Sequence, residues 1–233
     1  MRLSLVLPAF NEVAIAAGSV RAVDDVLAGL ECEYEIIVVD DGSEDGTAEA
    51  VEAIGLPSVR VVRRPHRGKG AALSTGLSEA TGKYIGFLDI DLEISADYLP
   101  EFVDALNGGY DVAIGSKVLD PVESRKRPLN KRLATAGYNW LVRRLLKTSF
   151  RDHQAGLKLF RREALSPVIG LVESPGWLWD TEVLIRCVGN NCRVKEIAVA
   201  TRPVRAGHVS VVSSSLVVLR QLVRLRKSLN GLI

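Results

Sequence analysis

The chain has 233 residues, of which 47% are hydrophobic and 25% charged, which excludes an intrinsically disordered chain and suits one large domain with a full core. Its three cysteines have no metal-ligand spacing, so free thiols of a cytosolic protein are the simplest account. No signal peptide is predicted, and the longest uncharged stretch, residues 206–219, is shorter than the roughly 20 apolar residues of a membrane-spanning helix.

The net charge of +2 hides a strong asymmetry along the chain. Residues 1–116 carry 8 basic and 20 acidic side chains, whereas residues 117–162 carry 13 basic and 3 acidic ones. This segregation predicts an acidic front half, where a metal ion could sit, beside a basic segment that meets a phosphate-bearing partner or surface. A solvated basic helix face is the alternative interpretation of that segment.

The first half of the chain alternates short apolar runs with segments of helical length. The runs are rich in β-branched residues and predict buried strands over residues 3–7, 35–39, 59–62, 84–88 and 112–114. The segments between them predict helices over residues 12–30, 46–54, 69–80 and 96–106. The alternation predicts an α/β fold with a mostly parallel central sheet and helices on both faces.

Polar loops follow four of these strands, and in such sheets binding sites lie beyond the carboxyl ends of the strands. The loops are residues 8–12, 40–43, 67–70 and 89–91. Turn preferences explain each loop alone, but four of them at one edge predict a site. The glycine-rich motifs of dinucleotide-binding and P-loop proteins are absent from the sequence, so those two readings lose their main support.

The fourth strand runs into Asp89, Asp91 and Glu93 at alternating positions. An extended backbone would point all three side chains to one face. Converging carboxylates repel one another, and a hard divalent cation is the usual reason to tolerate them. The pattern therefore predicts a metal site, with helix capping by Asp89 and a solvated Glu93 as the alternative.

The second half is less regular. The basic segment begins at Arg125, a helix is predicted over residues 131–147, and residues 152–160 are typical of a loop entering a strand. His153 in that loop is interpreted as structural. Asp180 and Glu182 lie at the start of a predicted helix, where capping alone favours acidic residues.

The tail, residues 210–229, is a predicted amphipathic helix. Its apolar face holds Val218, Leu222, Leu225 and Leu229, and its opposite face holds Arg220, Arg224 and Lys227. Such a helix either lies on an anionic bilayer or docks on the domain or on a second subunit. We expect one domain over residues 1–209 and this basic amphipathic helix over 210–233.

Five sequence motifs resemble those of the GT-A glycosyltransferases of family 2. They are Leu7-Pro8-Ala9-Phe10-Asn11-Glu12, Val38-Val39-Asp40-Asp41-Gly42-Ser43, Arg67-Gly68-Lys69-Gly70, Leu88-Asp89-Ile90-Asp91 and Gly115-Ser116-Lys117. The similarity covers roughly residues 1–210. Residues 152–160 and 179–182 are similar to the dolichyl-phosphate or polyprenyl-phosphate hexose synthases within that family.

The resemblance implies a Rossmann-like GT-A domain that moves a hexose, with inversion, from a GDP- or UDP-linked nucleotide-sugar to a polyprenyl or dolichyl phosphate. It places the donor base and ribose, with Lys69 nearby, at Pro8, Ala9, Glu12 and Asp40. It assigns Asp89 and Asp91 to a Mg²⁺ or Mn²⁺ ion that bridges the donor diphosphate, with Glu93 where some relatives have a further ligand. Lys117 replaces an arginine that is common in the family, and lysine is not an equivalent phosphate ligand.

The acceptor decides which other residues take part, while Asp91 is the central catalytic candidate in either case. A hydroxyl acceptor needs a general base, for which Asp180 and Glu182 are the candidates. A lipid monophosphate is largely ionised near neutral pH, since its second pKa is about 6, and it needs cations to position it. The candidate cations are Lys117, Arg125, Arg127, Lys131 and Arg132.

Three alternatives remain: a family 2 enzyme that glycosylates a sugar or protein hydroxyl, a nucleotidyltransferase, and a non-catalytic nucleotide-sugar-binding module. For the polyprenyl-phosphate glycosyltransferase, we expect a peripheral protein on the cytoplasmic face of the membrane. A membrane-spanning partner subunit is a further expectation, and no nucleic-acid partner is expected.

Overall fold

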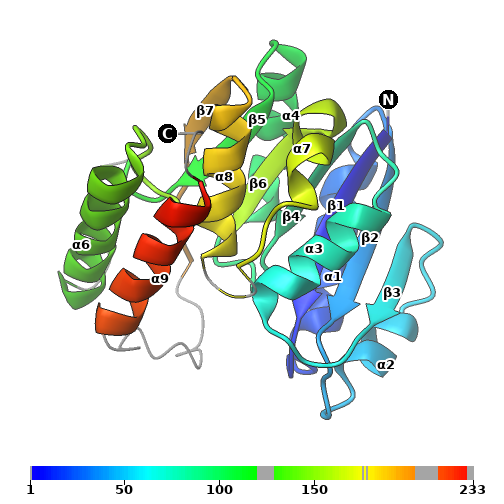
Figure 1. Cartoon of the computed structure of the whole chain (residues 1–233). Coiled ribbons are helices and arrows are strands. Elements are labelled where there is room, and N and C mark those ends of the chain that lie inside the picture. Colours follow the sequence, from blue (N-terminus) through cyan, green and yellow to red (C-terminus); the bar gives the residue numbers. More distant parts are fainter. Residues whose placement is uncertain (1, 120–128, 175, 177, 203–214, 230–233) are drawn as a thin grey trace.

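The computed structural model describes residues 2–119, 129–174, 176, 178–202 and 215–229, and its core is one seven-stranded sheet (Figure 1). The strand order is β3-β2-β1-β4-β6-β5-β7. The strands are β1 (Arg2–Ala9), β2 (Glu33–Asp40), β3 (Val59–Arg63), β4 (Tyr84–Leu88), β5 (Val112–Ser116), β6 (Leu157–Arg161) and β7 (Val194–Ala198). Only β6 runs antiparallel to its neighbours, so the predicted mostly parallel α/β sheet is confirmed.

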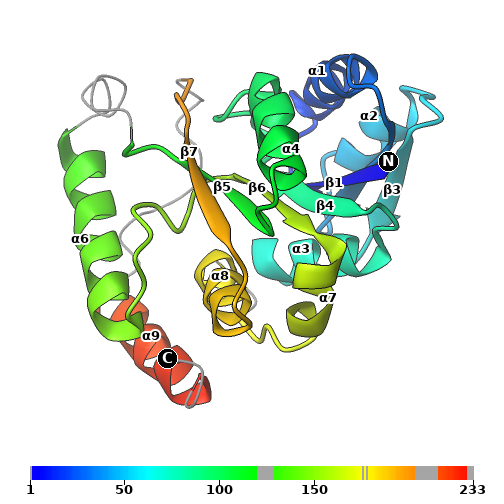
Figure 2. The ribbon, with the colours of Figure 1, turned by 90° about the horizontal axis from the view of Figure 1, so that it is seen from above.

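Helices cover both faces of the sheet (Figure 2). One face carries α1 (Ala16–Ala28), α2 (Thr47–Glu52) and α4 (Leu99–Asn107), the last preceded by the short 3₁₀ turn η1 (Ala96–Tyr98). The other face carries α3 (Lys69–Glu79), α7 (Arg162–Ile169) and α8 (Trp179–Gly189). The indole of Trp179 donates to Ser74 at 2.7 Å and so joins α8 to α3.

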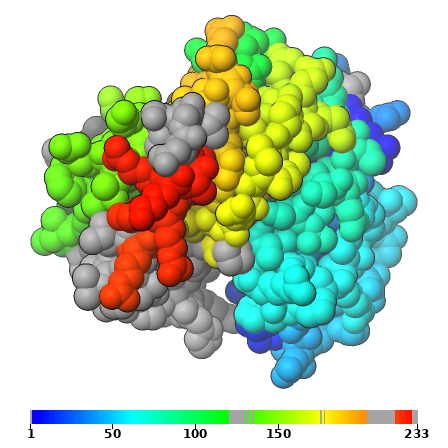
Figure 3. Space-filling view, in the orientation of Figure 1, coloured from blue at the N-terminus to red at the C-terminus, as the bar shows by residue number. Residues whose placement is uncertain are grey.

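Two further helices, α6 (Leu129–Leu146) and α9 (Ser215–Ser228), form one end of the molecule beside α8 (Figures 1 and 3). Their contact buries Val142 and Leu146 of α6 against Leu222 and Leu225 of α9. The predicted amphipathic tail helix is therefore present, and its apolar face docks on the chain itself. None of the described helices combines the length and the apolar character needed to cross a bilayer. The expected domain boundary at residue 209 lies outside the described residues.

Candidate active site

The carboxyl ends of β1, β2 and β4 lie side by side because these three strands are neighbours and parallel. Since β6 is antiparallel to β4, the segment that precedes β6 reaches the same edge. The backbone N–H of Asp89 donates to the carbonyl of Gly156 at 2.9 Å, which ties the end of β4 to that segment. The topology thus brings the predicted loops to one edge and adds residues 152–156 to them.

The loops after β1 and β2 are bonded into one wall. The N–H of Asn11 donates to Ser43 Oγ at 2.8 Å, and the N–H of Glu12 donates to Thr47 Oγ1 at 2.8 Å. Asp40 is buried and accepts hydrogen bonds from the N–H and hydroxyl of Ser43. Its carboxylate therefore shapes the turn between β2 and α2, next to the place where the resemblance puts the donor ribose.

Pro8 and Ala9 end β1 at this wall, Pro8 half-buried and Ala9 buried. The structure thus groups Pro8, Ala9, Glu12 and Asp40 on neighbouring strand ends, as the predicted donor site requires. Their contact with a nucleotide-sugar stays a prediction.

Asp41 is a site residue that sequence reasoning treated as part of a turn. Its buried carboxylate accepts hydrogen bonds from the N–H groups of Arg67 (3.2 Å) and Gly68 (2.7 Å). It also forms an ion pair with Arg64 at 3.2 Å. Asp41 therefore holds the loop that leads into α3 and fixes the position of Lys69 at the start of that helix. The signal in the sequence was a second acidic residue directly after an apolar strand.

The acidic segment after β4 does not continue as a strand. Leu92 donates its N–H to the carbonyl of Asp89 at 3.0 Å and has a positive φ of 49°, so the chain turns here. The prediction that an extended backbone aligns the three carboxylates is therefore wrong, because the backbone closes a turn. Glu93 points to Lys117, whose Nζ lies 3.3 Å from Glu93 Oε2.

Asp89 and Asp91 remain close together, and they differ in how their charge is compensated. Lys69 Nζ lies 2.7 Å from Asp89 Oδ1 and 3.0 Å from Oδ2. Asp91 accepts one hydrogen bond, from the N–H of Glu93 at 3.0 Å, and no described residue forms an ion pair with it. Burial, followed by the neighbouring carboxylates of Asp89 and Glu93, raises the pKa of Asp91, although Lys69 and the Glu93 N–H partly oppose this.

These two carboxylates fit a divalent cation. Asp89 Oδ1 is buried without a hydrogen bond of good geometry, and Asp91 carries the least compensated charge of the group. The described residues contain no cluster of three histidine, cysteine or acidic side chains with metal-binding geometry. Glu93 is paired with Lys117, and its assignment as a further ligand stays a prediction. Two carboxylates suit an ion such as Mg²⁺, which takes its other ligands from substrate phosphates and water.

A chain of buried charges leads from the core to Asp89. Lys158 of β6 is fully buried and lies 2.5 Å from Asp180 Oδ1, and its ammonium also donates to the carbonyl of Ala155 at 2.8 Å. Asp180 Oδ2 lies 3.8 Å from Lys69 Nζ, which pairs with Asp89. Both ammonium groups lie over the ring of Phe87, 5.4 and 5.1 Å from its centroid.

Asp180 is buried and paired with lysines, whereas a general base must reach the hydroxyl proton of the acceptor. Its carboxylate is 1% exposed and lies between two ammonium groups. Asp89 and Asp180 also act on Lys69: burial by itself would lower the pKa of Lys69, but the two carboxylates outweigh it and raise the pKa. Sequence reasoning missed Lys158, although a lysine inside an otherwise apolar predicted strand was the available signal.

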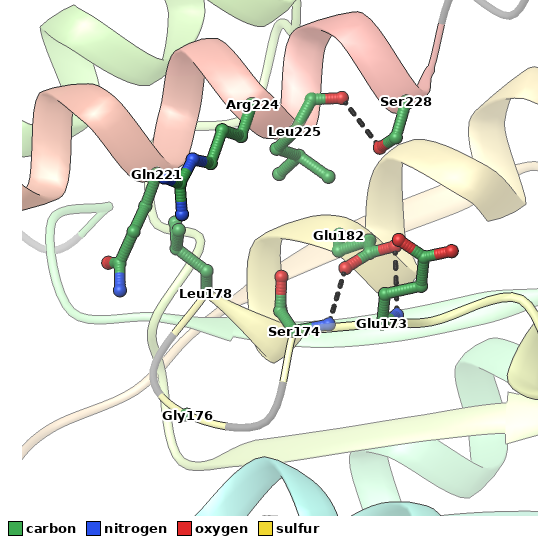
Figure 4. A pocket seen from close by; sticks show the side chains of 9 residues that line it. All are labelled: Glu173, Ser174, Gly176, Leu178, Glu182, Gln221, Arg224, Leu225 and Ser228. Atoms are coloured by element: carbon green, nitrogen blue, oxygen red, sulfur yellow. Dashed lines mark hydrogen bonds between the residues drawn. The ribbon is translucent and has the colours of Figure 1, made fainter.

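Glu182, the second candidate base, faces away from the acidic pair. Its carboxylate accepts a hydrogen bond from Arg186 Nε at 2.9 Å. It also accepts from the N–H groups of Glu173 and Ser174, which Figure 4 shows. It lines a pocket of about 460 Å³ between the 173–178 loop, α8 and α9. The structure therefore gives Glu182 a loop-holding contact, and its assignment as a base stays a prediction that these contacts do not favour.

The residues predicted to hold an acceptor phosphate are only partly described. Lys117 directly follows β5 at the sheet edge, and its backbone N–H donates to Asp152 Oδ2 at 3.1 Å. Arg132 is half-buried in the first turns of α6. Arg125 and Arg127 lie outside the described residues, as does the side chain of Lys131. Their assignment to the acceptor stays a prediction.

His153 ties α6 to the loop before β6, as its structural interpretation predicts. The ring is fully buried, with Nδ1 3.0 Å from Asn139 Oδ1 on α6 and Nε2 2.7 Å from Thr148 Oγ1. Burial, together with the nearby charges of Lys158 and Arg143, lowers the pKa of His153 to about 4 against the opposing effect of Asp152. The ring is therefore neutral in the folded protein at neutral pH.

The low pKa of His153 predicts a pH-dependent loss of stability. Because an unfolded histidine has a pKa near 6.5, the unfolded state binds the proton first, and the free energy of unfolding falls as pH drops from about 6.5 to about 4. We expect His153 to account for about 3 kcal/mol of this loss, and His153→Gln to lack it in urea titrations across that range. His66→Gln, at a half-exposed histidine, should retain it, and equal pH slopes in wild type and His153→Gln would contradict the assignment.

Comparisons with known proteins identify the family of the chain. The family model described as glycosyl transferase family 2 matches residues 4–168. The chain is 34% identical to glycosyltransferase AglD of Haloferax volcanii over 210 residues, covering 87% of the chain and 33% of AglD. It is 27% identical to the dolichyl-phosphate beta-glucosyltransferase of Saccharomyces cerevisiae, covering 96% of the chain and 74% of that protein. The chain thus spans a third of one of these relatives and about three quarters of the other.

Solved structures with the same fold include glucosyl-3-phosphoglycerate synthase from Mycobacterium tuberculosis. Its complex with Mn²⁺, UDP and phosphoglyceric acid superposes with a TM-score of 0.74 at 22% sequence identity, covering 96% of this chain and 78% of that one. A complex of the same enzyme with Mg²⁺ and UDP gives a TM-score of 0.68 at 23% identity, covering 96% and 78% of the two chains. At these identities the likeness establishes the GT-A type of fold.

Proposed function

The chain belongs to glycosyl transferase family 2 and is a glycosyltransferase, and from this premise we propose that it transfers a hexose from a UDP- or GDP-linked nucleotide-sugar to a polyprenyl or dolichyl phosphate. The observation that carries the proposal is the half-buried carboxylate of Asp91, with which no described residue forms an ion pair, beside the Asp89–Lys69 pair at the sheet edge. A family match of this kind gives no support to a nucleotidyltransferase or to a non-catalytic module.

The proposed mechanism follows from where negative charge develops. When the bond between the sugar and the donor diphosphate breaks, negative charge develops on the departing diphosphate. A Mg²⁺ or Mn²⁺ ion bound there would stabilise this charge as a Lewis acid. Asp91 and Asp89 would hold that ion, and Lys69 keeps Asp89 in place through its 2.7 Å ion pair. The loop held by Asp41 brings backbone N–H groups and Lys69 to the same edge.

Two observations support a phosphate acceptor over a hydroxyl acceptor. A hydroxyl needs a general base within reach, yet Asp180 is buried between Lys158 and Lys69, and Glu182 is bound to Arg186 and two loop N–H groups. An ionised lipid phosphate needs cations only, and the basic stretch over residues 117–162 supplies them. Inversion in a single displacement is then the expected stereochemistry.

The names of related proteins support a lipid-phosphate acceptor and a divalent metal cofactor. One is named for dolichyl phosphate as its acceptor, and the superposable synthase carries Mn²⁺ or Mg²⁺ with UDP. We therefore propose Mg²⁺ or Mn²⁺ as cofactor. We also propose a peripheral position on the cytoplasmic face of the membrane and a possible membrane-spanning partner subunit, which co-purification from solubilised membranes would test.

A donor and acceptor screen tests the proposed function. We expect turnover of one UDP- or GDP-hexose with Mg²⁺ or Mn²⁺ in the presence of polyprenyl phosphate, with a glycosyl phospholipid as product detected by mass spectrometry. Unphosphorylated polyprenol should react at least about a hundredfold more slowly, since the cationic residues then have no ionised group to position. Equal transfer to polyprenol, or to a sugar hydroxyl, would reject the phosphate acceptor.

A further inference from the structure

One side of α6 presents a line of large apolar side chains to solvent. Leu129, Leu133 and Trp140 are 64%, 65% and 61% exposed, and they are the three most exposed large hydrophobic side chains that the structure describes. On a helix with about 100° per residue they lie within about 40° of one another. The small residues Ala136 and Gly137 are exposed between them, so the line is not interrupted by a polar group.

This line is not the face that packs on the protein. The inner side of α6 carries Val142 and Leu146, both fully buried against α8 and α9. In Figure 2 the helix is the outermost element at its end of the molecule. Single exposed apolar residues are common, but three in line on one helix indicate a binding surface.

The charged residues of α6 and α9 are all basic. Arg143, Arg144 and Lys147 are exposed at the end of α6, and neither α6 nor α9 contains an acidic residue. On α9 the exposed basic residues are Arg220, Arg224, Arg226 and Lys227. Arg226 donates to the carbonyl of Leu145 at 2.6 Å, which ties α9 to α6, and the two helices lie side by side (Figure 3).

The chemistry of this surface selects its partner. Two copies of the chain would bring like charges together, which disfavours self-association through this face. A bilayer with anionic headgroups offers the opposite charge, and leucine and tryptophan in line with arginine and lysine suit the boundary between headgroups and acyl chains. The apolar face of α9 is not available for this role, since Leu222 and Leu225 are buried.

We propose that α6 lies on an anionic phospholipid bilayer, with Leu129, Leu133 and Trp140 in the headgroup boundary and the basic residues of α6 and α9 at the lipid phosphates. The bilayer contact would bring the active site close to an acceptor carried in the membrane. This role of the contact rests on the proposed function, whereas the contact itself does not. The amphipathic tail, for which the sequence leaves a bilayer and docking on protein as alternatives, docks on the chain itself, and the proposed membrane contact lies on the exposed side of α6 instead.

Vesicle flotation of the whole chain tests the contact. We expect binding to phosphatidylcholine vesicles that contain about 30% phosphatidylglycerol, and weak binding to phosphatidylcholine alone. Leu133→Ser combined with Trp140→Ser should weaken binding at least about tenfold, because both side chains leave the boundary. Leu171→Ser, at a 53% exposed leucine elsewhere, is the matched control and should bind as the wild type does.

Two further measurements separate the alternatives. In a Trp177→Phe background, brominated lipids should quench tryptophan fluorescence, and adding Trp140→Phe should abolish the quenching, since the remaining Trp179 is fully buried. Transfer to a short, water-soluble isoprenyl phosphate should be unchanged in the double variant, so a failure of the proposed activity leaves the vesicle result intact. Unchanged vesicle binding by the double variant would overturn the proposal, as would a concentration-dependent dimer that the same substitutions dissolve.

Discussion

Replacing Asp91 by asparagine is expected to lower sugar transfer at least about a thousandfold. The amide has the shape of the carboxylate but no charge, so it holds a divalent cation far more weakly than Asp91 would. Burial, and then the neighbouring carboxylates of Asp89 and Glu93, raise the pKa of Asp91, and no described residue forms an ion pair with it, so a cation bound there would stabilise its charge. The effect should therefore fall on metal binding and on the chemical step together.

Two measurements check this expectation. Transfer is followed with the donor and acceptor found in the screen, and Mn²⁺ binding is followed by electron paramagnetic resonance, which needs no turnover. Asp97→Asn is the matched control, because Asp97 is a highly exposed carboxylate six residues later, whose contacts are a hydrogen bond from Ser95 Oγ at 2.6 Å and an exposed ion pair with Arg202 at 3.4 Å. Full Mn²⁺ affinity in Asp91→Asn would reject Asp91 as the main ligand, whatever its activity.

Replacing Lys158 by methionine is expected to lower the free energy of unfolding by about 3–5 kcal/mol. Methionine has a similar length, so little volume is lost, but Asp180 then keeps its buried charge with Lys69 at 3.8 Å as its remaining described ion-pair partner. An uncompensated buried charge is the dominant cost. Urea denaturation measures the change, and Lys83→Met, at an exposed lysine beside β4, should change stability little.

A double variant separates stability from function. Adding Asp180→Leu to Lys158→Met removes both buried charges, so the free energy of unfolding should recover by several kcal/mol. Lys69 then loses its second carboxylate, and donor affinity should fall about tenfold even in the restabilised protein. Recovery of both stability and donor affinity would show that the Lys158–Asp180 pair does not position Lys69. A double variant as unstable as the single one would show that the pair is not the source of the loss.

The location of the site could be predicted from sequence because it depends on local patterns. Alternating apolar runs identified β1 to β5, and a parallel sheet necessarily brings the ends of β1, β2 and β4 to one edge. Such patterns did not determine two other features. The extended backbone predicted after Leu88 was wrong, because the chain turns at Leu92. The sequence left the partner of the tail's apolar face open between membrane and protein, and the structure packs that face on α6 and α8.

The sequence by itself thus determined the fold class, the family and the acidic edge, since these depend on periodicity and on motifs of neighbouring residues. Only the tertiary structure decided which carboxylates are paired with a lysine. No described residue forms an ion pair with Asp91, whereas Asp89 meets Lys69 from α3 and Asp180 meets Lys158 from β6. The physical reason is that the charge balance of a buried carboxylate depends on its neighbours in space, and here they come from segments about 20 residues away in sequence.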